Sequence, residues 1–375
     1  MDLDFTPEQD LLRETVAGVA QRYCDLKVVR ELEDDPLGYA DKLWAQLADL
    51  GLIGLTLPEE FGGTGMSMLD AVIVYTEFGR AAIPSPHFAS SVMSGGVLAL
   101  AGSDEQKSEW LTKVASGEAI ITPAWLEPGR GFGPKGVALA ATKDGDGWKL
   151  NGTKRHVYFA KAADRLLVLA HTPDGPSMFL VDTNANGVGL DQQKSIGSDT
   201  QYEVTFTDVH VDASDVIGTP GDAWQTWDTV MHDGIILLAA QAVGGARYSL
   251  DITVQYSKDR YQFDKPLGAF QALAHNMSDA VTALDGAETL VWETGWAHSE
   301  GHSVKRLAPM AKLFACQTFR DITAMAQQIF GGVGFTVEYD IQLYFRRAKQ
   351  LQISWWDNRY LEDLIAADVL DSRAS

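Results

Sequence analysis

The sequence is poor in cysteine and in positive charge, and it has no long apolar run. Its 375 residues include two cysteines, Cys24 and Cys316, which are too few for a disulfide framework, so we expect both to be reduced core residues. No apolar stretch approaches the roughly 20 residues that a membrane helix needs, and the N-terminus shows no basic-then-apolar signal pattern. We therefore expect a cytoplasmic protein that has no membrane partner.

Positive charge is scarce relative to negative charge. The chain has 30 lysines and arginines against 51 aspartates and glutamates, a formal net charge of −21. This balance argues against nucleic acid and against anionic membranes as partners. A polyanionic ligand would have to be bound by a few cations placed locally.

The period of the apolar residues changes twice along the chain. Thr6, Pro7 and Gln9 predict a capped helix start, and helical patterns continue to about residue 120. Short apolar runs separated by Asp-Gly and Asn-Gly turns then predict strands, and long helical patterns return afterwards. The sequence thus predicts an α+β chain with an N-terminal all-α domain (1–120), a middle antiparallel β barrel or sandwich (121–217) and a C-terminal four-helix bundle (218–375).

A segment between two long helical patterns combines unusual residue types. Residues 257–275 read SKDRYQFDKPLGAFQALAH, and apolar spacing predicts a helix that starts at Gln271. The cation Arg260, the aromatic Phe263, a Pro-Leu-Gly turn and an amide at a helix start suit a ligand that carries both phosphate and a ring. Taken alone, the segment is better explained as a loop between two bundle helices with a surface arginine.

Two further motifs accompany this segment. Residues 328–335 read QIFGGVGF, and residues 58–63 read PEEFGG after a Leu-Gly-Leu segment. Together with Arg-x-Gln-Phe at 260–263, they resemble signatures of the acyl-CoA dehydrogenase family over nearly the full length. The resemblance implies that family's three-part fold, the cofactor FAD, and the α,β-dehydrogenation of an acyl-CoA substrate.

The resemblance also implies cofactor-binding residues. In dimers of this family, the ADP half of each flavin is held by the neighbouring subunit. The matching positions here are Arg260, Phe263, Phe270, Gln271, Gln328, Gly331 and Gly332. A guanidinium suits pyrophosphate, and glycines let the main chain approach a phosphate closely.

The segments that form the family's flavin-ring bed differ in this chain. A Thr-Glu-Pro-x-x-Gly-Ser segment reads Leu126-Glu127-Pro128-Gly129-Arg130-Gly131-Phe132 here, so the threonine and the serine are lost. A Lys-x-Trp-Ile-Thr segment reads Lys154-Arg155-His156-Val157-Tyr158. A leucine side chain cannot hydrogen-bond a flavin, whereas a tyrosine still can but fills more space.

The catalytic base also differs. The family uses a glutamate that removes the substrate α-proton while the flavin takes hydride from the β-carbon. The position after the Arg-Asp-Ala-Lys-like segment holds Trp355, and the alternative position on the preceding helix holds Gly234. Indole cannot accept the proton, so the nearest candidates are Asp357 and Asp233, each of which could also be an ordinary acidic residue at a helix boundary.

Two groups of family residues therefore differ in how well this chain retains them. The residues that this chain would lend to a neighbour's flavin are present, while those for its own flavin ring and base have changed. The chain is similar to the non-catalytic subunit of actinobacterial heterotetrameric acyl-CoA dehydrogenases, several of which act in steroid degradation. We expect a homologous partner subunit in an α₂β₂ oxidoreductase of lipid metabolism. The alternatives are a self-sufficient homotetramer with an aspartate base and an inactive CoA-thioester-binding scaffold.

Overall fold

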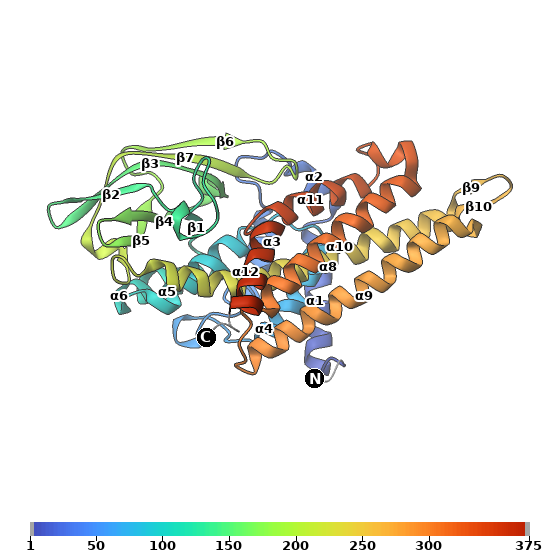
Figure 1. Ribbon diagram of the computed structural model, residues 1–375, viewed down its shortest axis with the longest axis horizontal. Helices are drawn as coiled ribbons and strands as arrows, with labels where there is room; N and C mark the ends of the chain where they lie inside the picture. The colour runs from blue at the N-terminus through green and yellow to red at the C-terminus, as the bar shows by residue number, and fades with distance from the viewer. Residues whose placement is uncertain (1–3, 372–375) are drawn as a thin grey trace. The chain divides into compact units, whose positions relative to one another are not determined.

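The computed structural model describes residues 4–371, which form two compact units (Figure 1). The helical unit comprises residues 4–29, 67–83 and 235–371, and the β unit comprises residues 30–66 and 84–234. The predicted fold, with helices, then strands, then helices along the chain, is confirmed. The three domain ranges ending at residues 120, 217 and 375 stay a prediction, because each compact unit combines stretches from different parts of the chain.

The helical unit consists mainly of long helices. Its elements are α1 (Pro7–Tyr23), most of α2 (Leu26–Glu31), α4 (Met68–Arg80), the later part of α8 (Ala223–Asp259), the hairpin β9 (Tyr261–Gln262) and β10 (Lys265–Pro266), η7 (Leu267–Ala269), α9 (Gln271–Ser299), α10 (Leu307–Phe330), η8 (Gly331–Phe335), α11 (Ile341–Ile353) and α12 (Asn358–Leu370). Helix α10 packs against α9, α11 and α12, and α4 packs against α1 and α9.

Two helix starts agree with the sequence. Thr6 is the N-cap of α1: its Oγ1 accepts from the Gln9 N–H (3.3 Å), and the Gln9 side chain accepts from the Thr6 N–H (3.2 Å). Helix α9 begins at Gln271, where the apolar spacing predicted it. Local sequence therefore determines where these helices begin.

Helices α4 and α8 cross at glycines. A Cβ on Gly79 would lie 1.9 Å from the carbonyl oxygen of Gln241, and a Cβ on Gly244 would lie 1.8 Å from that of Thr76. Real Cβ atoms do not approach a carbonyl oxygen so closely, because such contacts overlap the van der Waals radii of both atoms. The two helices can approach this closely only because neither position carries a side chain.

The β unit contains one sheet and several short helices. Its strands are β1 (Ile121–Ala124), β2 (Ala140–Asp144), β3 (Gly147–Tyr158), β4 (Arg165–Thr172), β5 (Gly175–Asp182), β6 (Val188–Gln193), β7 (Gln201–Val211) and β8 (Val216–Ile217). Its helices include α3 (Asp41–Asp49), η1 (Glu59–Phe61), η2 (Phe88–Gly95), α5 (Gly96–Ala101), α6 (Asp104–Gln106), η3 (Lys107–Leu111), α7 (Thr112–Ala115), η4 (Pro134–Gly136), η5 (Ala160–Ala162), η6 (Ala213–Asp215) and the beginning of α8.

The sheet is mostly antiparallel, as predicted, and follows the order β6-β7-β3-β2-β4-β5-β8. Two of its pairings are parallel: β1 pairs with β4, and β2 touches β4 at Ala140 and His171. These pairings join strands that are distant in sequence, so no turn signal could reveal them. Alternate residues of the strands point to one face and form a core around Trp148, Phe179 and Phe206.

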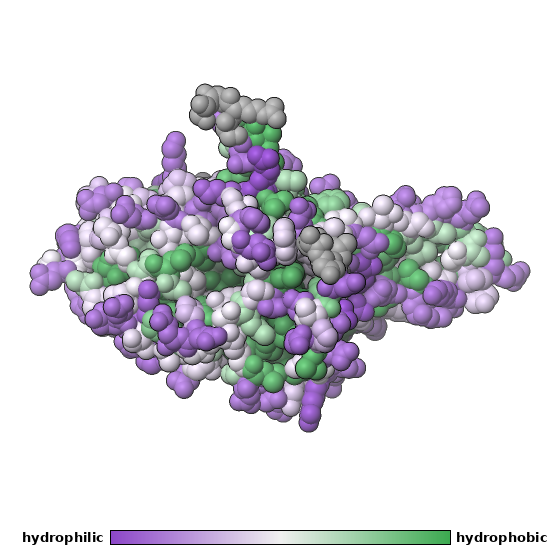
Figure 2. All heavy atoms as spheres, turned by 90° about the horizontal axis from the view of Figure 1, so that it is seen from below, coloured by the Kyte–Doolittle hydropathy of each residue, from purple (hydrophilic) through white to green (hydrophobic). Residues whose placement is uncertain are grey.

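Burial explains two other features of the composition. By length and composition, α8 is the one helix within residues 4–371 that could cross a membrane, but 83% of its most apolar window is buried inside the protein, as in a core helix. Cys24 and Cys316 are buried and free, as expected. Hydrophilic side chains cover much of the face seen in Figure 2.

We expect Gly79→Ala to lower the free energy of unfolding by about 1–3 kcal/mol, because the methyl group would force α4 and α8 apart. Gly18→Ala is the matched control, because Gly18 is an exposed residue inside α1 with nothing within 4 Å of its ideal Cβ. That substitution should stabilise the protein by roughly 0.5–1 kcal/mol. Urea unfolding measures both, and equal stabilisation by the two alanines would contradict the close crossing.

Candidate flavin-nucleotide and catalytic sites

Arg260 follows α8 and has its main chain held on both sides. Its N–H donates to the carbonyl of Tyr256 (2.9 Å), and its carbonyl accepts from the N–H of Leu267 (2.8 Å). Its side chain is exposed. The sequence therefore places a guanidinium on a fixed backbone with its charge directed to the outside of its own chain.

The hairpin β9–β10 places aromatic rings beside this arginine. Phe263 and Asp264 have φ of 55° and 61°, as a two-residue hairpin turn requires, although glycine and asparagine are the usual residues there. Phe263 is 87% exposed, and its ring lies 6.3 Å from that of Phe270 in an edge-to-face arrangement. The Lys265 ammonium lies 4.1 Å from the Phe270 centroid, and Gln271 begins α9 with an exposed side chain. One short segment thus presents cations, rings and an amide.

The second nucleotide motif lies where α10 ends. Gln328 is exposed, and Gly331 has a φ of 65°, a conformation that favours glycine. Nothing lies within 4 Å of an ideal Cβ on Gly331 or Gly332. The main chain here is open to the approach of another molecule.

A stacked pair of aromatic rings joins the two motifs. The rings of Tyr256 and Phe330 lie 4.2 Å apart, and the Tyr256 hydroxyl donates to the Phe330 carbonyl (3.5 Å). Tyr256 precedes Arg260 by one helical turn, and Phe330 is followed directly by Gly331. The structure therefore brings the Arg260 segment and the Gln328 segment to the same part of the helical unit, and their assignment as cofactor-binding residues stays a prediction.

The two segments of the expected ring bed lie side by side in the β unit. The Arg155 N–H donates to the Leu126 carbonyl (3.0 Å), and the Thr122 hydroxyl donates to the Tyr158 carbonyl (2.6 Å). His156 lies on a β-bulge with a φ of 54°, is exposed, and has Nδ1 2.8 Å from Oε1 of Gln201. The bed is assembled as the resemblance implies, but its side chains are leucine, histidine and tyrosine.

A buried ion pair fixes the first of these segments. Lys154 Nζ lies 2.7 Å from Glu127 Oε1, which also accepts from the N–H groups of Ala138 and Leu139 (2.8 Å each). Burial lowers the pKa of Lys154 to about 8, although the neighbouring carboxylate raises it. Burial raises the pKa of Glu127, but Lys154 and the hydrogen bonds outweigh this effect and hold it below its ordinary value. The retained Glu-Pro-Gly sequence therefore has a structural role.

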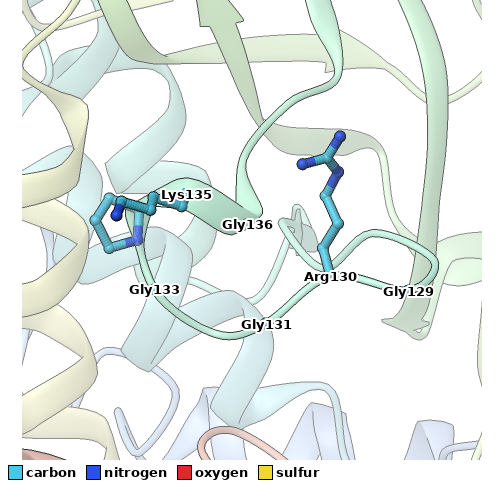
Figure 3. A pocket seen from close by; sticks show the side chains of 7 residues that line it. Gly129, Arg130, Gly131, Gly133, Lys135 and Gly136 are labelled. Atoms are coloured by element: carbon cyan, nitrogen blue, oxygen red, sulfur yellow. The ribbon is translucent and has the colours of Figure 1, made fainter.

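The loop after Glu127 surrounds a cavity of about 380 Å³. It is lined by four glycines, Pro134 and two basic residues, Arg130 and Lys135, whose side chains start from opposite sides of the loop in Figure 3. A Cβ on Gly136 would lie 2.1 Å from the Gly131 carbonyl oxygen, so this close turn requires glycine. Bare main chain and two cations could hold a phosphate group, a feature that the sequence analysis did not single out.

Neither position at which the resemblance places the base holds a carboxylate in this chain. At Gly234 in the β unit, a Cβ would lie 2.8 Å from Sδ of Met93 and 3.2 Å from Cζ of Phe88, so a side chain there would require these two flexible side chains to shift. Position 355 in the helical unit carries a buried indole. The chain therefore differs from the family's catalytic pattern in packing as well as in sequence.

The two substitute aspartates have different surroundings. Asp357 is the N-cap of α12, and its Oδ1 accepts from the Tyr360 N–H (2.9 Å). Asp233 is a half-buried residue of α8 in the β unit. The helix cap accounts for Asp357 without a catalytic role, and the role of both residues as a base stays a prediction.

Lys312 is a residue of this region that sequence reasoning missed. It is fully buried in α10, and its ammonium donates to main-chain carbonyls between residues 351 and 356. The sequence held one signal, because Lys312 is the only charged residue between Leu307 and Phe319 in an otherwise apolar and small-residue stretch.

Three models of protein families match the chain in order. They are the N-terminal domain of acyl-CoA dehydrogenase over residues 6–118, the middle domain over residues 123–209 and the C-terminal domain over residues 223–370. The chain therefore belongs to the acyl-CoA dehydrogenase family, which is a family of FAD-binding proteins.

Individual proteins agree over the full length. The probable acyl-CoA dehydrogenase YngJ of Bacillus subtilis (strain 168) is 30% identical over 382 residues, covering 99% of this chain and 100% of its own. The ChsE4-ChsE5 complex from Mycobacterium tuberculosis contains a chain of similar structure (TM-score 0.89, 26% identity, 98% and 99% of the chains covered). So does a variant of the Tcur3481-Tcur3483 steroid ACAD (TM-score 0.88, 28% identity, 98% and 99% covered).

We expect Lys154→Met to lower the free energy of unfolding by about 2–4 kcal/mol, because the Glu127 carboxylate loses its buried partner and keeps only the half-exposed Arg130, 3.5 Å from its Oε2. Adding Glu127→Gln should recover part of this loss, since the amide oxygen still accepts from Ala138 and Leu139 and carries no charge. Urea unfolding of the single and double variants forms the test. Purely additive effects would show that the pair is not coupled.

Substitutions of Asp357 distinguish a helix-capping role from a role as the catalytic base. Asp357→Asn should leave stability and activity nearly unchanged, because asparagine caps helices as well as aspartate does, whereas Asp357→Ala should cost about 1 kcal/mol of stability. Thermal unfolding and the dehydrogenase activity of the flavin-loaded protein are measured together. A large loss of activity in the asparagine variant, with stability unchanged, would identify Asp357 as the base.

Proposed function

We propose that this chain is a subunit of an α₂β₂-type, FAD-dependent acyl-CoA dehydrogenase, in which it lends the ADP half-site to a homologous catalytic partner. The observation that carries the proposal is the contrast between two regions. Five of the seven nucleotide-motif residues are exposed, whereas both positions for the base are filled by apolar groups. A chain that binds a neighbour's cofactor needs the first region and not the second.

The residues at the end of α8 and at the end of α10 fit the ADP half of FAD. Arg260 would bind pyrophosphate oxygens, and the open main chain at Gly331 and Gly332 would let the nucleotide approach. FAD supplies hydride acceptance when it is bound. The side chains of this chain's own ring bed do not match the family pattern, since Leu126 offers no hydrogen bond, so we place the flavin ring and the base in the partner.

Relatives support a hetero-oligomer and suggest a substrate. Two of the similar structures contain a pair of different chains, and one of them is a steroid enzyme of the same family. We propose by analogy that the substrate is a CoA thioester with a bulky acyl group of the steroid side-chain type. A pair of chains with one flavin-containing active site instead of two would leave more room for such an acyl group. Free, buried cysteines and the acidic charge agree with a cytoplasmic location.

Two alternative functions each conflict with one observation. A self-sufficient homotetramer would use Asp357 or Asp233 as the base, and the helix-cap role of Asp357 weighs against it. An inactive CoA-thioester-binding scaffold would need no nucleotide half-site, and the exposed cation Arg260 beside the open glycines weighs against this second alternative.

The flavin content decides among these functions. We expect the chain purified alone to be colourless and inactive, and to yield one flavin per pair of chains when it is co-expressed with its partner. Absorbance of the flavin per chain measures this. One flavin for every chain of the protein alone would establish the homotetramer, and no flavin with any partner would favour the scaffold.

Arg260→Gln in the co-purified complex tests the half-site itself. Loss of a charge-assisted contact worth about 1.5–3 kcal/mol should weaken FAD binding roughly 10- to 100-fold. Arg13→Gln is the matched control, since Arg13 is an exposed arginine of α1 that pairs with Asp10. Equal FAD affinity of the two variants would exclude Arg260 from the cofactor site.

A further inference from the structure

A buried lysine reaches the turn that joins α11 and α12. The Lys312 ammonium donates to the carbonyls of Leu351 (3.3 Å), Ser354 (3.0 Å) and Trp356 (2.8 Å). Its side chain is completely buried, so water cannot replace these contacts. One side chain of α10 therefore holds three main-chain groups of a segment that follows it by about 40 residues.

The charge of Lys312 is balanced by dipoles. Its side chain makes no ion pair among the ion pairs found in residues 4–371, although Cys316 and Asp357 are the groups that raise its pKa against the lowering effect of burial. Leu351 lies in the last turn of α11, whose carbonyls lack partners within the helix and form the negative end of its dipole, whereas Ser354 is the C-cap and Trp356 lies in the turn that follows. An ammonium is the natural partner for such a cluster of oxygens.

The turn itself has an unfavourable backbone. Trp355 and Trp356 are consecutive residues with φ of 52° and 73°, a left-handed conformation that bulky side chains rarely adopt. Trp356 is completely buried, and its ring lies 5.3 Å from that of Tyr360. A turn of this kind persists only where the surrounding structure holds it.

We propose that Lys312 is the positioning residue of this turn, and that it sets the direction in which position 355 presents its side chain. The inference rests on the proposed function, because that function identifies position 355 as the position at which the family carries its base. In this chain position 355 is occupied by the buried indole of Trp355. That side chain is then part of an ordered turn that Lys312 maintains.

Fluorine NMR of the chain labelled with fluorotryptophan tests the proposal. The ten tryptophans give ten signals, and Trp355→Phe and Trp356→Phe each remove one and so assign it. Lys312→Met is expected to shift or broaden the signals of Trp355 and Trp356 and to leave the signals of the β unit, such as Trp148, in place. Circular dichroism confirms that the variant is folded.

Lys154→Met is the matched control, because Lys154 is the other completely buried lysine and belongs to the β unit. It should leave the signals of Trp355 and Trp356 unchanged. The proposal is overturned if these two signals keep their positions in folded Lys312→Met, or if Lys154→Met, shown by circular dichroism to be folded, moves them equally.

A second measurement needs no substitution at Lys312. With isotope-labelled lysine, Lys312 and Lys154 should both give ammonium signals that exchange slowly with water, because both side chains are completely buried and hydrogen-bonded, and the signal that remains in Lys154→Met is that of Lys312. Rapid exchange would overturn the proposal even if Lys312→Met fails to fold. Both measurements use the chain without flavin or partner, so their outcome does not depend on the proposed hetero-oligomer. A failure of this proposal can therefore be told apart from a failure of the proposed function.

Discussion

A buried ammonium needs oxygen atoms in place of water, and in the helical unit this requirement ties three helices together. Lys312 of α10 binds the end of α11 and the turn that leads to Asp357, the N-cap of α12. Because the desolvated charge would be strongly unfavourable without these carbonyls, the turn and the lysine depend on each other. The two left-handed tryptophans lie inside this arrangement.

In the β unit, a buried ammonium is likewise bound by oxygen atoms, and one of them belongs to a carboxylate. Lys154 and Glu127 form a buried pair, and Glu127 also binds the N–H groups of Ala138 and Leu139 across the glycine-rich loop. In both units the polar groups that shape the backbone are present, while neighbouring side chains that would carry chemistry differ from the family pattern. The scaffold of a dehydrogenase is thus separable from its catalytic groups, as proteins with one fold and several roles require.

The exposed nucleotide motif gives these differences a functional meaning. Arg260, Phe263 and Gln271 direct charge, ring and amide away from their own chain, in a protein whose net charge is strongly negative. The cation Arg260 would attract a dinucleotide locally against the general repulsion of the surface. We propose that this arrangement serves a neighbouring subunit, because a scaffold would need none of these exposed groups.

The sequence by itself determined the order of helices and strands, the capped start of α1 at Thr6 and the start of α9 at Gln271, because these depend on residues a few positions apart. Its motifs also identified the family. Only the tertiary structure decided that Phe88 and Met93 fill the space beside Gly234, that β1 pairs in parallel with β4, and that Lys312 reaches the turn after α11. These contacts join residues far apart in the chain, and their formation depends on packing of the whole unit rather than on any local pattern.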